Sequence, residues 1–353
     1  MNADPRHLQR PALLPESGPL AQGVPDPSAR RIVERVIASG APAPEAMTPE
    51  QGRQAFRDSR AALTHIAPPA SLVRDITLRG AAGPIGARLY RGAACDAGAL
   101  LPVWVFFHSG GWVAGDLETH DAVCRSIATL AHCAVVAVDY RLAPEHRFPA
   151  AVDDAWAALR HIASDGAALG LDTQRIAVGG DSAGGNLAAV AALMARDAGG
   201  PALLMQVLVY PATDFAGRHV SRERLGARPP LTGQTLDWFA TQYLRSESDR
   251  TDWRASPLLA PDLAGVAPAM LVTCGCDPLE DEAIAYGRRL QAAGALLHYR
   301  RFPGQVHGFI TMGGAIPETT ILLGEIAAAL DLAFDRAAAA QPDRRQAAPR
   351  EAP

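Results

Sequence analysis

The chain has 353 residues, 48% of them apolar, which is enough for one large α/β domain or two ordinary ones. Its formal net charge is −4, with charges of both signs spread along the sequence, so we expect no nucleic-acid partner and no stable membrane insertion. We expect neither a transmembrane segment nor a secretory signal, and the odd set of five cysteines is typical of reduced thiols in the cytoplasm.

The first elements along the chain are two short helices. They fall between residues 29 and 63, in the stretches RRIVERVIAS and PEQGRQAFRDSRAAL, with a proline-rich break between them. Thr48 followed by Pro49 predicts the start of the second helix, as N-cap and first helical residue. The preceding residues 1–28 are rich in proline, glycine and charge, and we expect them to be flexible.

Strand and helix patterns then alternate along the chain. The strand candidates are 73–79, 86–91, 103–107, 134–139, 175–179, 204–210, 269–274 and 297–302, and helices are expected near 120–132, 149–164, 183–197, 281–293 and 318–335. The first strand alternates apolar and polar residues, which is typical of an outer strand with one wet face. The strands at 134–139 and 204–210 are nearly continuous apolar runs, as expected of parallel strands covered on both faces. This alternation predicts an α/β fold with a mostly parallel sheet flanked by helices.

Two segments depart from the alternation. Residues 214–255 are polar and rich in arginine and proline, and their length predicts an insertion that folds as part of a lid. The tail at residues 337–353 is expected to be disordered. We find no internal repeats.

A nucleophile motif lies at the turn between the fifth strand and the following helix. Gly180-Asp181-Ser182-Ala183-Gly184 matches G-x-S-x-G, and it directly follows the apolar strand RIAVG. Such a tight strand-to-helix turn strains the serine backbone and requires small neighbours, and it raises the hydroxyl above the carboxyl end of the sheet. We therefore predict Ser182 as the nucleophile.

A serine hydroxyl needs an adjacent base, and the base needs an acid that orients it. His307 follows the last strand candidate, so its loop reaches the same sheet edge as Ser182. Asp277 directly follows the strand AMLVTCG and is predicted to orient His307, with Glu280 and Asp281 as fallbacks. The order serine, aspartate, histidine is the one found on α/β-hydrolase sheets.

A glycine pair follows the strand VWVFF, in His108-Ser109-Gly110-Gly111-Trp112. Glycines allow backbone N–H groups to approach a substrate closely. With the N–H of Ala183, those of Gly110 and Gly111 are predicted to form an oxyanion hole.

Together these motifs resemble the bacterial hormone-sensitive-lipase-type esterases, also called family IV lipolytic enzymes. The matching stretches are HSGGWVAGDLETHD (108–121), DYRLAPEHRFPAAVDD (139–154), GGDSAGGNLA (179–188), YPATD (210–214), SPL (256–258), CDPLEDE (276–282) and HGF (307–309). The resemblance implies an eight-stranded sheet, hydrolysis of short- to medium-chain acyl esters, and no cofactor. Because related esterases often dimerise, it also implies a homodimer.

The resemblance divides the chain into a catalytic domain and a helical cap. The expected parts are a flexible extension (1–28), N-terminal cap helices (29–66), an α/β-hydrolase catalytic domain (67–213 and 256–336), a cap insertion after the sixth strand (214–255) and a disordered tail (337–353).

The oxyanion motif departs from the family's usual HGGG, because Ser109 replaces the first glycine. His108 and Ser109 are expected to support the loop. Trp112, Asp181 and Phe309 are candidates for the substrate pocket.

We expect two further groups of polar residues to have structural rather than catalytic roles. Arg141, Glu145 and Asp154 are expected to form a buried network that braces the loops. Glu118, His120 and Asp121 lie where a loop meets a helix. We expect them to cap that helix and predict no metal site there.

We therefore predict a serine carboxylesterase that forms an acyl-enzyme on Ser182 and takes a small-molecule ester. An amidase for small molecules remains an alternative, as does a non-catalytic ligand-binding protein on the same scaffold, such as the plant gibberellin receptors. An interfacial lipase is less favoured, because no long apolar lid helix is present in the sequence.

Overall fold

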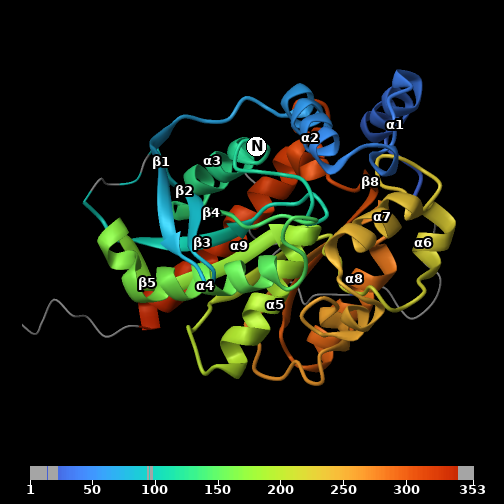
Figure 1. Cartoon of the computed structure of the whole chain (residues 1–353). Coiled ribbons are helices and arrows are strands. Elements are labelled where there is room, and N and C mark those ends of the chain that lie inside the picture. Colours follow the sequence, from blue (N-terminus) through green and yellow to red (C-terminus); the bar gives the residue numbers. More distant parts are fainter. Residues whose placement is uncertain (1–13, 15–22, 94, 96–97, 341–353) are drawn as a thin grey trace, which may run out of the picture.

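A single eight-stranded sheet organises the chain (Figure 1). The computed structural model describes residue 14 and residues 23–93, 95 and 98–340. The strands are β1 (Ala70–Arg79), β2 (Pro84–Gly92), β3 (Leu101–Phe107), β4 (Ala134–Asp139), β5 (Leu171–Asp181), β6 (Met205–Val209), β7 (Ala269–Cys276) and β8 (Leu296–Val306). Their order across the sheet is β1-β2-β4-β3-β5-β6-β7-β8.

Helices connect and flank these strands. They are α1 (Pro27–Ser39), α2 (Pro49–Leu63), α3 (Asp121–Leu130), α4 (Ala150–Asp165), α5 (Ala183–Asp197), α6 (Val220–Leu225), α7 (Gly233–Tyr243), α8 (Glu280–Ala292) and α9 (Glu318–Ala340). The 3₁₀ helices that bear on the site are η2 (Pro44–Ala46), η4 (Glu247–Thr251) and η6 (Phe309–Thr311).

The sheet is parallel except at one edge, where β1 pairs with β2 and β2 pairs with β4 in antiparallel register. The remaining pairs are parallel. Parallel strands direct their carboxyl ends to one edge of the sheet, and loops at that edge are where α/β folds place their sites. The prediction of a mostly parallel eight-stranded sheet flanked by helices is confirmed.

Apolar side chains cover both faces of the sheet. On one face, Leu159 of α4, Leu187 of α5 and Leu290 of α8 belong to a single buried cluster. On the other face, Ile127 of α3 and Leu330 of α9 belong to a second cluster. Strands covered on both faces must be apolar throughout, and β3, β6 and most of β7 are buried along their length.

Two separate segments lie together above the carboxyl ends of the strands. The first comprises η2 and α2 from the N-terminal part of the chain, and the second comprises α6 and α7 from the insertion (Figure 1). Thr48 caps α2 by accepting a hydrogen bond from Gln51 N, and Pro49 is the first helical residue, as predicted. The two segments touch where Thr235 Oγ1 donates to Glu45 Oε2 at 2.9 Å.

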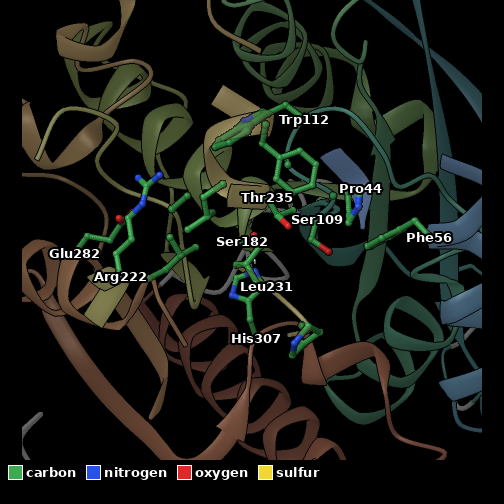
Figure 2. A pocket seen from close by; sticks show the side chains of 18 of the residues that line it. Pro44, Phe56, Ser109, Trp112, Ser182, Arg222, Leu231, Thr235, Glu282 and His307 are labelled. Carbon is green, nitrogen blue, oxygen red and sulfur yellow. Dashed lines mark hydrogen bonds between the residues drawn. The ribbon is translucent and has the colours of Figure 1, made fainter. Parts of the chain in front are cut away.

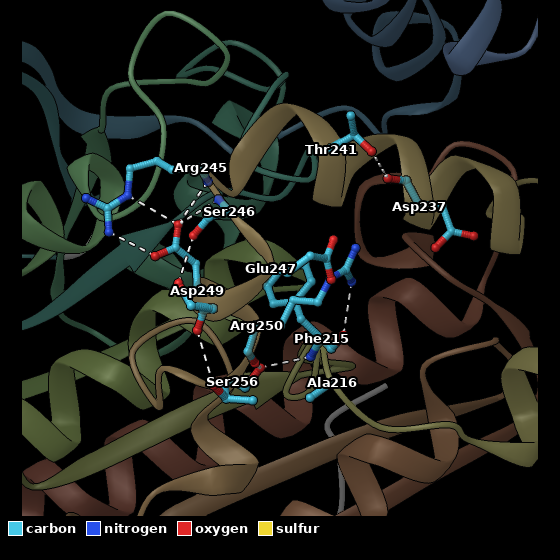
Figure 3. A network of polar contacts seen from close by, with 12 residues as sticks. Phe215, Ala216, Asp237, Thr241, Arg245, Ser246, Glu247, Asp249, Arg250 and Ser256 are labelled. Atoms are coloured by element: carbon cyan, nitrogen blue, oxygen red, sulfur yellow. Dashed lines mark hydrogen bonds and ion pairs between the residues drawn. The ribbon is translucent and has the colours of Figure 1, made fainter.

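Polar contacts fasten the end of the insertion to its beginning (Figure 3). Arg250 Nη1 donates to Phe215 O at 3.1 Å, and Ser256 Oγ donates to Arg250 O at 2.7 Å. Asp249 is buried and accepts hydrogen bonds from the backbone and guanidinium of Arg245. The insertion is therefore a closed unit, with both of its ends fixed beside the sheet.

The predicted terminal segments fall largely outside the described residues. Most of the expected flexible extension, residues 1–28, lies there, as do residues 341–353. The tail was predicted to begin at residue 337, but α9 continues to Ala340. The alanine-rich sequence that precedes Gln341 has a high helix propensity, which accounts for this difference.

Candidate active site

Ser182 occupies the single position between β5 and α5. Its backbone angles are φ 56° and ψ −116°, in a region that non-glycine residues rarely adopt. Such strain is expected of a nucleophile on a sharp strand-to-helix turn. The serine hydroxyl is thereby held at the N-terminal end of α5.

The glycines on either side of Ser182 are required by close backbone packing. A Cβ atom on Gly184 would lie 1.9 Å from Phe107 O, and one on Gly180 would lie 2.4 Å from the same oxygen. Neither position has room for a side chain. This crowding explains why the motif has a small residue at both positions.

His307 joins Ser182 to Asp277 through hydrogen bonds at both ring nitrogens. Its Nδ1 lies 2.7 Å from Asp277 Oδ2, and its Nε2 lies 2.8 Å from Ser182 Oγ. An ionised carboxylate only accepts hydrogen bonds, so Nδ1 of the neutral ring carries the proton and Nε2 accepts from the serine hydroxyl. Asp277 is fully buried, while Ser182 and His307 line a pocket (Figure 2).

The fallback acids are engaged elsewhere. Glu280 pairs with Arg301, with Oε1 2.7 Å from Nε. Asp281 Oδ2 accepts a hydrogen bond from Ser221 N. Of Asp277 and the two fallback acids, Asp277 is therefore the one that contacts His307.

The loop after β3 carries the two glycines predicted as oxyanion donors. Gly110 and Gly111 have φ values of 124° and 62°, and both residues line the pocket beside Ser182. A Cβ atom on Gly110 would lie 2.1 Å from Ala114 O, so this position also needs glycine. Within the described part of the chain, no hydrogen-bond acceptor is found for the N–H groups of Gly110, Gly111 or Ala183.

His108 is buried beneath this loop. Its Nδ1 donates to Ser109 O at 2.8 Å, and its ring stacks on Tyr140 with centroids 4.3 Å apart. Tyr140 OH donates to His108 O at 2.7 Å. Burial and the nearby His120 lower the pKa of His108 to about 4. The ring is therefore neutral near pH 7 and contacts the loop rather than the reacting groups.

The family model described as alpha/beta hydrolase fold matches residues 104–311, more than half of the chain. The carboxylic ester hydrolase LipN of Mycobacterium tuberculosis is 45% identical over 73% of this chain and 70% of its own length. The chain belongs to the hormone-sensitive-lipase-type (family IV) carboxylesterases.

Other relatives agree with this assignment. Ethyl acetate hydrolase of Pseudomonas putida is 39% identical over 82% of this chain and 92% of its own length. An esterase structure from the archaeon Pyrobaculum calidifontis superimposes with a TM-score of 0.82, at 40% identity over 88% of this chain and 98% of that one. The protein is thus a serine esterase, as its sequence predicts.

Residues of both the cap and the catalytic domain line the pocket of this esterase. Figure 2 shows Ser182 and His307 between two groups of residues, with Pro44 and Phe56 on one side and Arg222 and Glu282 on the other. Phe215, Leu231, Leu236 and Phe239 add apolar surface. These cap residues were not predicted individually, because the sequence motifs lie in the catalytic domain.

One predicted pocket residue lines the pocket, and two do not. Trp112 is in its wall, stacked on Tyr243 with centroids 4.4 Å apart. Asp181 is buried on the far side of the nucleophile turn, because successive residues at a strand end point in opposite directions. Phe309 is also fully buried, where it packs on Phe302 with centroids 5.1 Å apart. The predictions for Asp181 and Phe309 are corrected accordingly.

A buried polar cluster that was not predicted links the oxyanion loop to the nucleophile turn. His120 Nε2 lies 3.1 Å from Ser109 Oγ and 3.2 Å from Asp181 Oδ1. Burial alone would raise the pKa of Asp181, but interactions with His120 and Ser109 hold it below its usual value. The expected helix cap is not made by the His120 side chain, which forms no capping bond at the start of α3.

The expected network of Arg141, Glu145 and Asp154 forms only in part. Arg141 donates to the buried Asp154 at 2.8 Å through both Nε and Nη2. Glu145 is half-exposed and instead pairs with Arg53 of α2. It joins the cap to the catalytic domain and is not part of a buried network.

Neither a metal site nor a membrane span is found in the described residues. No group of three or more histidine, cysteine or acidic side chains there is placed to hold a metal ion. None of the helices described combines the length and the apolar character needed to cross a bilayer. The cysteines, all five of which are described, are free thiols.

Proposed function

We propose that Ser182, His307 and Asp277 are the catalytic triad of this esterase. Ser182 Oγ attacks the ester carbonyl while His307 Nε2 takes the hydroxyl proton. Asp277 keeps the proton on Nδ1 and stabilises the imidazolium. His307 then gives its proton to the departing alkoxide, and the acyl group remains on Ser182 as an ester.

Water completes the reaction at the same site. His307 removes a proton from water, the resulting hydroxide attacks the acyl carbon, and His307 returns the proton to Ser182 Oγ as its bond to the acyl carbon breaks. The N–H groups of Gly110, Gly111 and Ala183 stabilise the oxyanion of both tetrahedral intermediates. The products are one alcohol and one carboxylate, and no cofactor takes part.

The observation that carries this proposal is the continuous hydrogen-bonded line from Asp277 to Ser182, with distances of 2.7 and 2.8 Å. Further support comes from the positive φ of Ser182 and from the N–H groups beside it, for which the described part of the chain supplies no acceptor. The apolar wall formed by Trp112 and Phe215 suits a hydrocarbon chain. We therefore assign short- to medium-chain acyl esters as substrates.

The test is the replacement Ser182→Ala, assayed with p-nitrophenyl butyrate. We expect kcat to fall by about 10⁴-fold or more, because loss of a nucleophile leaves only the oxyanion hole and binding. Circular dichroism and the melting temperature check that the variant folds. Hydrolysis by folded Ser182→Ala near the wild-type rate would refute the proposal.

A matched ester and anilide with the same acyl group separate the esterase from the amidase alternative. We expect a much higher kcat/KM for the ester. A non-catalytic binding protein would turn over neither compound. The homodimer and the cytoplasmic location remain predictions from the sequence and the resemblance.

A further inference from the structure

Helix α2 carries three arginines on the face that meets the catalytic domain. Arg53, Arg57 and Arg60 follow the spacing i, i+4, i+7, which places them in one row. Arg53 donates to Val113 O and pairs with Glu145. Arg57 pairs with Asp116 at 2.6 Å. The first two arginines therefore have partners that hold the cap on the domain.

Arg60 has no comparable partner among the described residues. Its Nε and Nη1 are buried and make no hydrogen bond within the described residues. Its guanidinium lies over the ring of Phe56, 4.5 Å from the centroid, and burial lowers its pKa. Asp181 is close enough to attract it, but that carboxylate already contacts His120. Buried cations without a hydrogen-bond partner are rare and call for a ligand.

Arg60 lines the same pocket as Ser182 and His307. It packs against the residue that follows the catalytic histidine, since a Cβ atom on Gly308 would lie 3.4 Å from Arg60 Nη2. In the proposed mechanism, His307 protonates the departing alkoxide, so the alcohol portion of the ester lies on the histidine side. The guanidinium is therefore next to the alcohol portion rather than the acyl chain.

Among the described residues, the opposite end of the pocket offers an anion no comparable cation. Glu282 and Asp214 line that end, and Arg222, which is also there, pairs with Asp237. In Figure 2, Glu282 and Arg222 lie across Ser182 from Phe56, the residue on which Arg60 rests. An anion is thus favoured beside Arg60, whereas at the other end the cation Arg222 is already paired with Asp237.

We infer that the substrate's alcohol portion carries a carboxylate, and that Arg60 binds it. This inference rests on the proposed function and names its substrate class. The carboxylate does not react. The acyl carbon–oxygen bond breaks as before, water supplies the new carboxylate oxygen on the acyl side, and the hydroxy acid leaves with the proton from His307.

The test compares 3-acetoxybenzoate with 3-acetoxybenzamide, which share an acyl group and differ in the charge of the alcohol portion. We expect Arg60→Met to lower kcat/KM for the benzoate by roughly 10- to 100-fold, the effect of losing a hydrogen bond to a charged group. The value for the benzamide should change less than about threefold. Arg60→Lys keeps the charge and should retain part of the preference.

Arg57→Met is the matched control, because it removes the same charge one turn away on α2. It should leave the ratio of the two kcat/KM values unchanged. An equal loss on both substrates with Arg60→Met, or no loss on either, would overturn the inference. So would a loss confined to p-nitrophenyl hemisuccinate, which carries its carboxylate on the acyl side. Hydrolysis of p-nitrophenyl acetate by every variant shows that the proposed esterase mechanism still holds.

Discussion

Ser109 stands where the family's usual HGGG motif has its first glycine. Its hydroxyl has a defined hydrogen-bond partner. The side chain reaches His120 Nε2 at 3.1 Å, and the same nitrogen lies 3.2 Å from Asp181, the residue before the nucleophile. His120 Nδ1 lies 2.9 Å from Thr119 Oγ1, which fixes the ring. The cluster therefore connects the loop that holds the proposed oxyanion donors to the turn that holds Ser182.

We expect Ser109→Ala to lower kcat on p-nitrophenyl butyrate by about fivefold, the effect of losing one net hydrogen bond of about 1 kcal/mol. KM should change little, since the loop acts on the oxyanion rather than on the acyl chain. A double-mutant cycle with His120→Gln measures the coupling between the two residues. Strictly additive effects would show that the two side chains act independently.

For individual residues, the sequence predicted the positions of side chains that directly follow the end of a strand. A motif beside a strand end fixes where such a side chain lies. Ser182, Asp277 and His307 meet that condition. The partner of Ser109 was not predicted, because His120 reaches it only through the packing of α3. Asp181 was misplaced, since adjacency to Ser182 in sequence puts its side chain on the opposite face.

Asn186 links helix α5 to both ends of the cap insertion. The side chain is fully buried, and its Nδ2 donates to Ala212 O at 2.9 Å and to Ala255 O at 2.8 Å. Ala212 lies just before the insertion at residues 214–255, and Ala255 is its last residue. The same helix begins directly after Ser182, so a single element fixes the nucleophile and the base of the cap.

We expect Asn186→Ala to lower the free energy of unfolding by about 2 kcal/mol, because two buried carbonyls lose their donor. Asn186→Asp should cost more, since a carboxylate would then face two carbonyl oxygens in a buried site. Urea denaturation followed by tryptophan fluorescence measures both changes. Equal stability of Asn186→Asp and the wild type would contradict this role.

The existence of the insertion was predictable because its composition interrupts the strand–helix alternation. Its closure was not, because the contacts of Asn186 and of Arg250 join residues far apart in sequence. Glu145 illustrates the same limit. Its place in a family motif suggested burial, whereas its partner Arg53 comes from the cap.

Glu282 lies where the catalytic domain meets the cap. Its side chain is buried, and Oε1 accepts hydrogen bonds from Thr213 N at 2.7 Å and from Asp214 N at 3.2 Å. Burial raises the pKa of Glu282 to about 7, although these hydrogen bonds and the nearby His219 act in the opposite direction. Between about pH 4.3 and pH 7, Glu282 therefore keeps its proton in the folded protein, whereas it has lost the proton in the unfolded chain.

This difference makes stability depend on pH. Between the unfolded pKa of about 4.3 and the folded value, the native state binds more protons, so the contribution of Glu282 is present at low pH and is lost as the pH rises toward 7. Glu282→Gln keeps the accepting oxygen without the ionisation. We expect its stability relative to the wild type to be higher at pH 8 than at pH 5, by about 2–3 kcal/mol.

Urea denaturation of both proteins at the two pH values tests this expectation. His219, whose pKa is raised by its hydrogen bond with Asp214, also titrates in the region, and it is present in both proteins. A constant difference between the two proteins at pH 5 and pH 8 would contradict the linkage.

For the whole molecule, the fold was predictable because strand and helix periodicities alternate over most of the chain. The cap's packing was not, because short helices with mixed polar faces do not indicate which of their faces is buried. Arg60 belongs to this class. Its row on α2 is visible in the sequence, but only the fold shows that the third arginine of the row lines the pocket with no hydrogen bond to its Nε or Nη1 from the described residues.

The most direct test of the account is covalent labelling with a p-nitrophenyl alkylphosphonate, followed by intact-mass and peptide analysis. The triad predicts one phosphonyl group per chain, on the peptide that contains Ser182, with one equivalent of p-nitrophenol released and no labelling of Ser182→Ala. A label on a different residue, or an unlabelled protein that still hydrolyses esters, would contradict the assignment of Ser182 as the nucleophile.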